Sequence, residues 1–124
     1  MKLEELNVYT RAMVLGDQVW DIVSLWDFFA KDTIGKQLVR AVDSVAANLS
    51  EGFGRYHYRE SKHFYYYSRG SLFETKTWLT KAHNRRLLTH ELFQQMEKEL
   101  NNIGVKLNNY INSIGKAKSN GGEK

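Results

Sequence analysis

The absence of proline is the feature of this sequence that most limits its fold: none of its 124 residues is a proline. A proline inside a helix removes one backbone amide donor and clashes with the preceding turn, whereas loop-rich β proteins normally use proline in their connections. A chain of this length without proline therefore favours long, uninterrupted helices. We expect an all-α protein.

Apolar side chains recur at helical spacing in four successive segments of the chain. The first three segments run from about Leu6 to Phe29, Ile34 to Phe53 and Tyr58 to Leu87, and the fourth follows Thr89. Each segment predicts an amphipathic helix with one buried face. In chain order, the predicted buried faces contain Val8, Ala12, Leu15, Val19, Ile22, Val23 and Trp26; Leu38, Val39, Val42, Val45, Ala46, Leu49 and Phe53; Phe64, Ser68, Ser71, Thr75, Trp78, Leu79 and Ala82; and Leu92, Met96, Leu100, Ile103, Leu107, Tyr110 and Ile114.

Local signals predict where these helices begin and end. The side-chain oxygen of Asp32 or Thr33 can cap the second helix, and that of Thr89 can cap the fourth. Gly52 and Gly54 predict a left-handed residue that ends the second helix. Small residues on the third helix imply a closely packed neighbour.

The connections between the predicted helices are only a few residues long, so consecutive helices are expected to pack antiparallel. The predicted fold is an antiparallel up-down-up-down four-helix bundle in one domain, residues 1–115. Residues 116–124 are polar, glycine-rich and without periodicity, and we expect them to form a disordered tail.

Composition excludes several classes of site and partner. The sequence has no cysteine, which removes disulfides, thiolate zinc sites and a cysteine nucleophile, and fits a reducing cytoplasm. No apolar run approaches the ~20 residues of a membrane span, and the first residues lack the apolar stretch of a signal peptide. We therefore expect a cytoplasmic protein without a membrane partner. The net charge of +4 favours a polyanionic partner.

A motif in the second and third helices links the chain to a known family. Its letters are Arg40, Ser44, Ala46, Ala47, Asn48, Glu51, Gly52, Gly54, Arg55, Gly70, Ser71, Leu72 and Glu74. This pattern is similar to that of the four-helix-bundle proteins encoded by intervening sequences of bacterial 23S ribosomal RNA genes. The family often has two adjacent arginines near the start of the motif, whereas Val39 precedes Arg40 here.

The resemblance implies properties that the residues alone do not. It implies a homo-oligomeric helical bundle, commonly a ring of five subunits. A related accessory protein of diversity-generating retroelements resembles a basic pentamer that binds nucleic acid and a reverse transcriptase. By the same resemblance, RNA or DNA and an element-encoded protein are candidate partners of this chain.

Five polar residues of the second helix fall on one stripe: Arg40, Ser44, Asn48, Glu51 and Arg55. Their spacings of four, four, three and four residues keep them within roughly 80° of one another around the helix. The stripe could join subunits or bind phosphate, because arginine suits both carboxylate and phosphate. It could instead be an internal network, in which Glu51 pairs with Arg55 and Asn48 bonds a neighbouring helix.

A basic row follows the third helix. Lys62, Arg69, Lys76 and His83 recur every seven residues and so stay on nearly the same face. Tyr65, Tyr66 and Phe73 run beside the row and outside the predicted core. Basic residues with adjacent aromatic residues are typical of surfaces that follow a phosphate backbone and stack bases. The candidate nucleic-acid contacts are Arg40, Arg55, Arg59, Lys62, Arg69 and Lys76.

The same surface has two other interpretations. Lysine rows are common on solvated helix faces, and exposed aromatic residues can be buried by another subunit. We therefore also consider Ser44, Asn48, Glu51, Tyr65, Tyr66 and Phe73 as an oligomer interface or an internal polar network.

Nothing in the sequence predicts catalysis. No convergent acid, base or nucleophile is evident, so we expect neither enzymatic activity nor a cofactor. Glu60 and His63 form a single Glu-x-x-His pair, whereas di-metal bundles need two such pairs, so no metal site is expected. We predict a non-catalytic homo-oligomeric scaffold that binds RNA or DNA through a basic surface. The alternative is a structural module that binds only protein.

Overall fold

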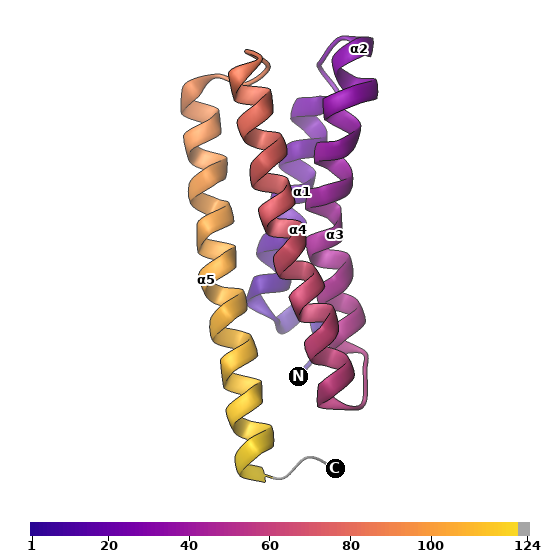
Figure 1. Cartoon of the computed structure of the whole chain (residues 1–124), viewed down its shortest axis with the longest axis vertical. Coiled ribbons are helices and arrows are strands. Elements are labelled where there is room, and N and C mark those ends of the chain that lie inside the picture. The colour runs from indigo at the N-terminus through magenta and orange to yellow at the C-terminus, as the bar shows by residue number, and fades with distance from the viewer. Residues whose placement is uncertain (122–124) are drawn as a thin grey trace.

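The computed structural model describes the backbone of residues 1–121 and the side chains of residues 1–115. Within that range every regular element is helical and no strand occurs. Four long helices lie side by side (Figure 1): α1 (Asn7–Val23), α3 (Lys36–Phe53), α4 (Tyr58–Asn84) and α5 (His90–Gly121). A short 3₁₀ helix, η1 (Leu3–Glu5), precedes α1. The expectation of an all-α protein with four helices is confirmed.

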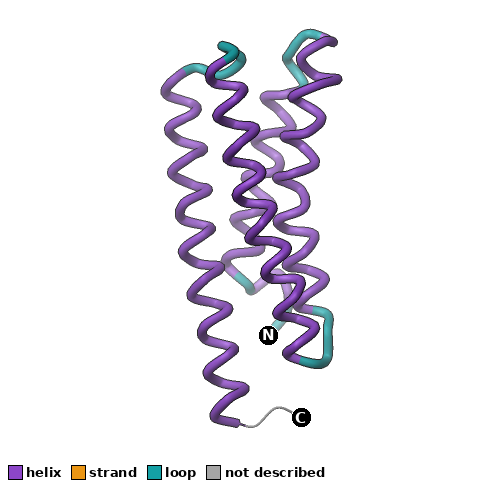
Figure 2. Tube along the Cα trace, in the orientation of Figure 1, coloured by secondary structure: helices purple, strands orange, loops and turns teal. Residues whose placement is uncertain are grey.

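Each long helix packs against two others, because α1 and α4 both contact α3 and α5. The connection between α3 and α4 and the connection between α4 and α5 lie at opposite ends of the molecule (Figure 2). One apolar core runs along the axis between the helices. Its most deeply buried large side chains are Leu15, Val19, Leu38, Val42, Val45, Leu49, Leu79, Ile103 and Leu107.

The start of the second long helix differs from the prediction. The α1 helix ends at Val23, and Asp27 caps a new helix by accepting a hydrogen bond from the Ala30 amide at 3.0 Å. Helix α2 (Phe28–Ala30) then continues through a π-helical turn, η2 (Lys31–Gly35), into α3 without a break. Asp32 and Thr33 were wrong as caps, because Asp27 satisfies the free amide one turn earlier and leaves both inside the helix.

Glycine ends α3 in a different way from the one we predicted. Gly54 has φ −79°, so no left-handed residue closes this helix. Gly52 is buried instead, and a Cβ added there would lie 2.5 Å from Cε1 of Tyr65 and 3.0 Å from the carbonyl oxygen of Ser61. The glycine therefore permits α3 and α4 to approach closely.

The buried face of α4 is rotated relative to the predicted one. Tyr65, which we placed outside the core, is only 2 % exposed, and Leu72 is buried as well. The space above Gly52 explains this, because it admits the Tyr65 ring between the helices. The ring packs edge-on against Tyr110, and the two hydroxyls are 3.5 Å apart. Burial, and to a lesser degree this hydrogen bond, raises the pKa of Tyr65 above its usual range, so the phenol stays neutral.

Small side chains on α4 pack closely against α3, as the sequence indicated. The Ser68 hydroxyl is fully buried and donates a hydrogen bond to the carbonyl oxygen of Val45 at 2.8 Å. This bond joins two helices and satisfies a polar group inside the core. The contact between α3 and α4 is the most extensive in the bundle.

The turn between α4 and α5 has one residue in the left-handed region. Arg86 has φ 63°, and the Leu87 amide then donates to the Ala82 carbonyl oxygen at 2.9 Å, which closes α4. The helix therefore ends three residues before the predicted Leu87. Thr89 caps α5 as predicted, because its hydroxyl accepts a hydrogen bond from the Leu92 amide at 3.2 Å.

The C-terminal part of α5 extends past the expected domain boundary. The backbone of α5 is helical to Gly121. The expected disordered tail, 116–124, stays a prediction, and its residues 122–124 lie outside the described residues. In the portion that the structure describes, no helix is long and apolar enough to cross a bilayer.

Candidate nucleic-acid interface

The outer face of α4 alternates cationic and aromatic side chains. Lys62, Tyr66, Arg69, Phe73 and Lys76 follow one another at spacings of four, three, four and three residues. These spacings keep all five on one side of a helix. Tyr66 is 44 % exposed and Phe73 is 65 % exposed, so both rings are accessible. We call these five residues the basic–aromatic stripe.

The first cation of the stripe lies close to two tyrosine rings. Nζ of Lys62 is 5.7 Å from the centre of the Tyr66 ring and 6.0 Å from that of Tyr58. Both distances are within the range of a weak cation–π contact at an exposed site. The contacts hold Lys62 along the surface of α4 without neutralising its charge.

Arg69, Phe73 and Lys76 also border a groove between α4 and α5. The groove has a volume of about 360 Å³. It is lined by Arg69, Leu72, Phe73, Lys76, Leu100, Asn101, Gly104, Val105 and Asn108. Its polar side chains are therefore two cations on one wall and two neutral amides on the other, and no carboxylate is among these lining residues.

In the described part of the chain, the cations of the stripe are not neutralised by direct ion pairs. Among the described residues, Lys62, Arg69 and Lys76 form no ion pair with a carboxylate. Of the two acidic residues of α4, Glu60 lies two residues from Lys62 and Glu74 lies two residues from Lys76. Glu74 accepts a hydrogen bond from the indole nitrogen of Trp78 at 3.1 Å. A row of unpaired cations produces a local positive potential that attracts polyanions.

The predicted polar stripe of α3 forms an internal network in part. Glu51 and Arg55 form an ion pair at 3.5 Å, and the Arg55 guanidinium lies 4.7 Å from the centre of the Phe64 ring. Asn48 does not reach a neighbouring helix, because its amide donates to the Ser44 carbonyl oxygen of its own helix at 2.9 Å. Arg55 is thus already engaged, while Arg59 remains exposed one turn before the basic–aromatic stripe.

His83, the fourth member of the predicted basic row, contacts His90 and Phe93 of α5. Its Nε2 lies 3.3 Å from Nδ1 of His90, and its ring stacks on Phe93 with the centres 4.4 Å apart. Neither histidine had a partner predicted from the sequence, because only the turn between α4 and α5 brings them together. In the part of the chain with described side chains, no group of three or more His, Asp or Glu residues could hold a metal ion.

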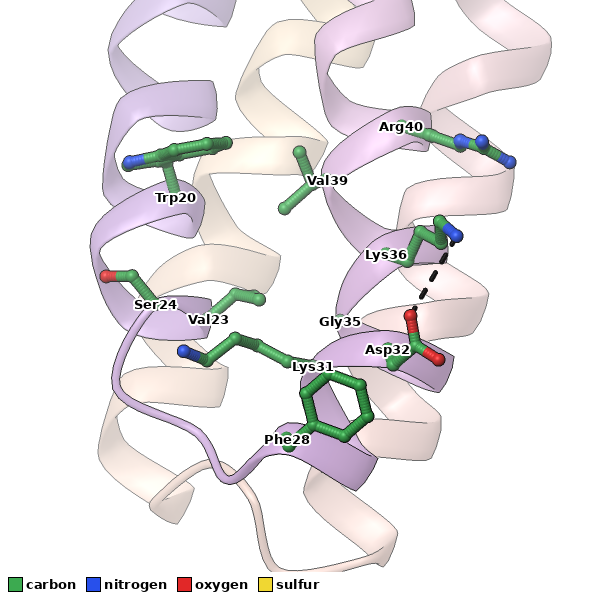
Figure 3. Close-up of a pocket in the computed structure, with 10 residues that line it drawn as sticks. All are labelled: Trp20, Val23, Ser24, Phe28, Lys31, Asp32, Gly35, Lys36, Val39 and Arg40. Carbon is green, nitrogen blue, oxygen red and sulfur yellow. Dashed lines mark ion pairs between the residues drawn. The ribbon is translucent and has the colours of Figure 1, made fainter.

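Arg40 lies away from the groove between α4 and α5. It lines a separate pocket where α1, α2, η2 and the first turns of α3 meet, together with Lys31 and Lys36 (Figure 3). The structure therefore brings Arg69, Phe73 and Lys76 together but separates Arg40 from them. Sequence reasoning missed this pocket, whose only local signal was the aromatic pair Phe28 and Phe29 beyond the first apolar face.

The family model described as 23S rRNA-intervening sequence protein matches residues 4–109. The fold is similar to a crystal structure from Bacteroides thetaiotaomicron, described as a protein with unknown function from the S23 ribosomal protein family. The two chains are 16% identical, the alignment covers 84% of this chain and 97% of the other, and the TM-score is 0.76. No curated protein matches the chain.

Proposed function

Because this chain belongs to the family of 23S rRNA-intervening sequence proteins, we propose that it is a non-catalytic helical scaffold that binds RNA or DNA through the basic–aromatic stripe. The observation that supports this most is the alternation of unpaired cations with exposed rings on α4. The cations would contact phosphates, and the Tyr66 and Phe73 rings would stack on bases.

The dimensions of the stripe favour a single strand. Lys62 and Lys76 are 14 residues apart, which corresponds to about 21 Å along a helix. Stacking on Tyr66 and Phe73 requires bases that are not already stacked in a duplex. The amides of Asn101 and Asn108 in the adjacent groove can donate to and accept from base edges. We therefore propose a single-stranded segment of a few nucleotides as the ligand.

The assembly that we propose is a ring-shaped homo-oligomer of up-down-up-down bundles, pentameric by family resemblance, in the cytoplasm. Exposed apolar side chains on α1 support a subunit contact there, since Met13 is 45 % exposed and Val14 is 56 % exposed. That surface is separate from the basic–aromatic stripe, so assembly would leave the stripe available to nucleic acid. Mass measurement by light scattering tests the subunit number, and a monomer would contradict the ring.

The binding proposal is tested with a charge-matched pair of variants. Arg69→Gln/Lys76→Gln removes two positive charges from the stripe, and Lys98→Gln/Lys106→Gln removes two from α5. Each protein is titrated into fluorescently labelled single-stranded RNA and DNA at low salt. We expect the first variant to lose most of its affinity and the second to bind nearly as tightly as the unchanged protein. Equal binding by the two variants, or no binding by the unchanged protein, would contradict the proposal.

The alternative is a module that binds only protein, and one observation favours it. Phe73 is 65 % exposed and Val105 is 60 % exposed on opposite walls of the same groove, an arrangement that a second polypeptide could cover. Under this alternative, the unchanged protein would not retain nucleic acid, and Phe73→Ala would reduce the measured mass of the assembly. Under the leading proposal the same substitution weakens nucleic-acid binding and leaves the mass unchanged.

A further inference from the structure

A second concave site lies at the end of the bundle where α1 turns into α2. Its volume is about 550 Å³, within the range of roughly 300–1,000 Å³ that small-molecule sites occupy. The lining residues are Trp20, Val23, Ser24, Phe28, Lys31, Asp32, Gly35, Lys36, Val39 and Arg40 (Figure 3). None of them belongs to the basic–aromatic stripe.

The local backbone creates this pocket. The π-helical turn η2 widens the helix between α2 and α3, and the Thr33 hydroxyl donates to the Phe29 carbonyl oxygen at 2.7 Å within it. Gly35 forms part of the floor, where an added Cβ would lie 2.7 Å from Cγ1 of Val23. Single π-helical turns recur at functional sites because they displace the side chains that follow them.

The walls of the pocket are apolar and poorly covered. Trp20 is 62 % exposed and Phe28 is 79 % exposed, and Figure 3 shows the Trp20 ring near Val39 and the Phe28 ring beside Lys31. Two large aromatic side chains on an open surface leave much apolar area in contact with water. Contiguous exposed apolar surface of this kind marks a ligand or partner site in a soluble protein.

The charged residues of the pocket favour an anion. Lys31 extends between the apolar walls toward Ser24 (Figure 3). Lys36 and Arg40 lie at the opposite edge of the pocket and point away from it (Figure 3). The single lining carboxylate, Asp32, pairs with Lys36 at 3.9 Å. Among the described residues, Lys31 and Arg40 have no ion-pair partner. An apolar pocket with unpaired cations suits a ligand that has both an apolar body and a negative charge.

We propose that this pocket binds an amphipathic anion, which is an apolar body with one carboxylate, sulfonate or phosphate group. The apolar body packs against Trp20 and Phe28, and the anionic group binds Lys31. This proposal is independent of nucleic-acid binding, because the two sites share no side chain and either can fail without the other.

Two fluorescent probes that differ by one charge test the proposal. The first is 8-anilinonaphthalene-1-sulfonate, and the second is N-phenyl-1-naphthylamine, which has the same aromatic body without the sulfonate. Both are titrated into the full-length protein with the fold monitored by circular dichroism. We expect the sulfonate to bind at least about tenfold more tightly, since hydrogen bonds to charged groups are the stronger ones. Equal affinity for the two probes would overturn the assignment of an anion site.

Three substitutions then test whether the probes bind in this pocket. Lys31→Gln is expected to reduce sulfonate affinity about tenfold and to leave the uncharged probe unaffected, because only the charge is removed. Trp20→Ala is expected to weaken both probes. Tyr56→Ala, which removes a ring that is 79 % exposed in the connection between α3 and α4, is the control and should change neither. If the control weakens the probes as much as Trp20→Ala does, the probes bind elsewhere and the proposal is wrong.

Competition distinguishes the possible sources of such an anion. Sodium decanoate, used below its micelle concentration, represents a free amphiphile, and a short peptide of alternating leucine and glutamate represents a protein segment. Displacement of the sulfonate by decanoate supports the proposal, whereas displacement by the peptide alone overturns it, because the occupant would then be a protein segment. Displacement by neither overturns it. Binding of the probe only when the protein is diluted to monomers would also overturn it, since a second copy would then cover the pocket.

Discussion

Gly52 shows how the lack of one side chain determines the packing of two helices. It is buried in α3, and the ring of Tyr65 occupies the space that a side chain at this position would fill. Tyr65 then reaches the core and meets Tyr110 on α5. The glycine in the family motif is therefore explained by close approach between helices and not by a left-handed turn.

Gly52→Ala is expected to destabilise the protein by about 1–3 kcal/mol, because the added methyl group forces the Tyr65 ring or α4 to move. The free energy of unfolding is measured by urea denaturation. The control is Gly70→Ala on α4, where no atom lies within 4 Å of an added Cβ. That substitution should stabilise the helix by about 0.5–1 kcal/mol. A loss of stability in Gly70→Ala as large as that in Gly52→Ala would contradict this explanation.

The ionised carboxylate of Asp43 destabilises the folded protein, and the size of this effect depends on pH. Partial burial, and then the nearby charge of Asp17, raises the pKa of Asp43 above its usual value. The folded protein therefore holds this proton more tightly than the unfolded chain does, so stability falls as pH rises through the interval between the two pKa values. We expect Asp43→Asn to raise the melting temperature slightly at neutral pH. The gain should vanish below the pKa of the unfolded chain, at about pH 3.9; a pH-independent gain would exclude this cause.

At the scale of whole elements, the sequence predicted the existence of each helix better than its ends. The apolar period identified all four long helices, and the buried faces of α1, α3 and α5 largely agree with the predicted ones. The errors lie where two local signals compete. Asp27 caps α2 five residues before Asp32, and a π-helical turn then continues into α3 where a connection was expected.

Thr89 is a local signal that the structure confirms, and its contribution can be measured. Its hydroxyl satisfies a free amide at the start of α5. Thr89→Ala should therefore cost about 1 kcal/mol of stability in thermal or urea unfolding. Thr80→Ala is the comparison, because the Thr80 hydroxyl donates only to the Lys76 carbonyl oxygen within its own exposed helix at 2.8 Å. A similar loss in both variants would show that the cap is not responsible.

At the scale of the whole molecule, charge distribution matters more than net charge. The chain has a net charge of +4, which by itself is a small excess. The helical fold collects three unpaired cations of α4 on one face, together with two accessible aromatic rings. Such a face attracts a polyanion even though the protein as a whole is only mildly basic.

The salt dependence of binding should report how many of these cations contact phosphate. Each contact with a single strand contributes about −0.7 to the slope of log affinity against log salt concentration. The slope for the unchanged protein should therefore be about −2 if Lys62, Arg69 and Lys76 all bind phosphate. Lys76→Gln should make it shallower by about 0.7, while Lys98→Gln should leave it unchanged. A slope near zero would exclude binding by this face.

By itself, the sequence determined the fold class and the residues available for function. The lack of proline and the apolar period require long amphipathic helices, because these are local properties of the backbone and of neighbouring turns. The spacing of Lys62, Arg69 and Lys76 likewise placed them on one face before any tertiary contact was known. The motif around Asn48 and Glu51 was sufficient to indicate the family.

Only the tertiary structure decided which aromatic rings are buried and where a second site forms. Tyr65 and Tyr66 are adjacent in sequence, but only Tyr65 faces the space left by Gly52. The pocket around Trp20 and Lys31 joins residues from α1 and from the π-helical turn, which contact through the packing of separate helices. Contacts of this kind depend on shape complementarity between separate helices, and periodicity within one helix contains no information about it.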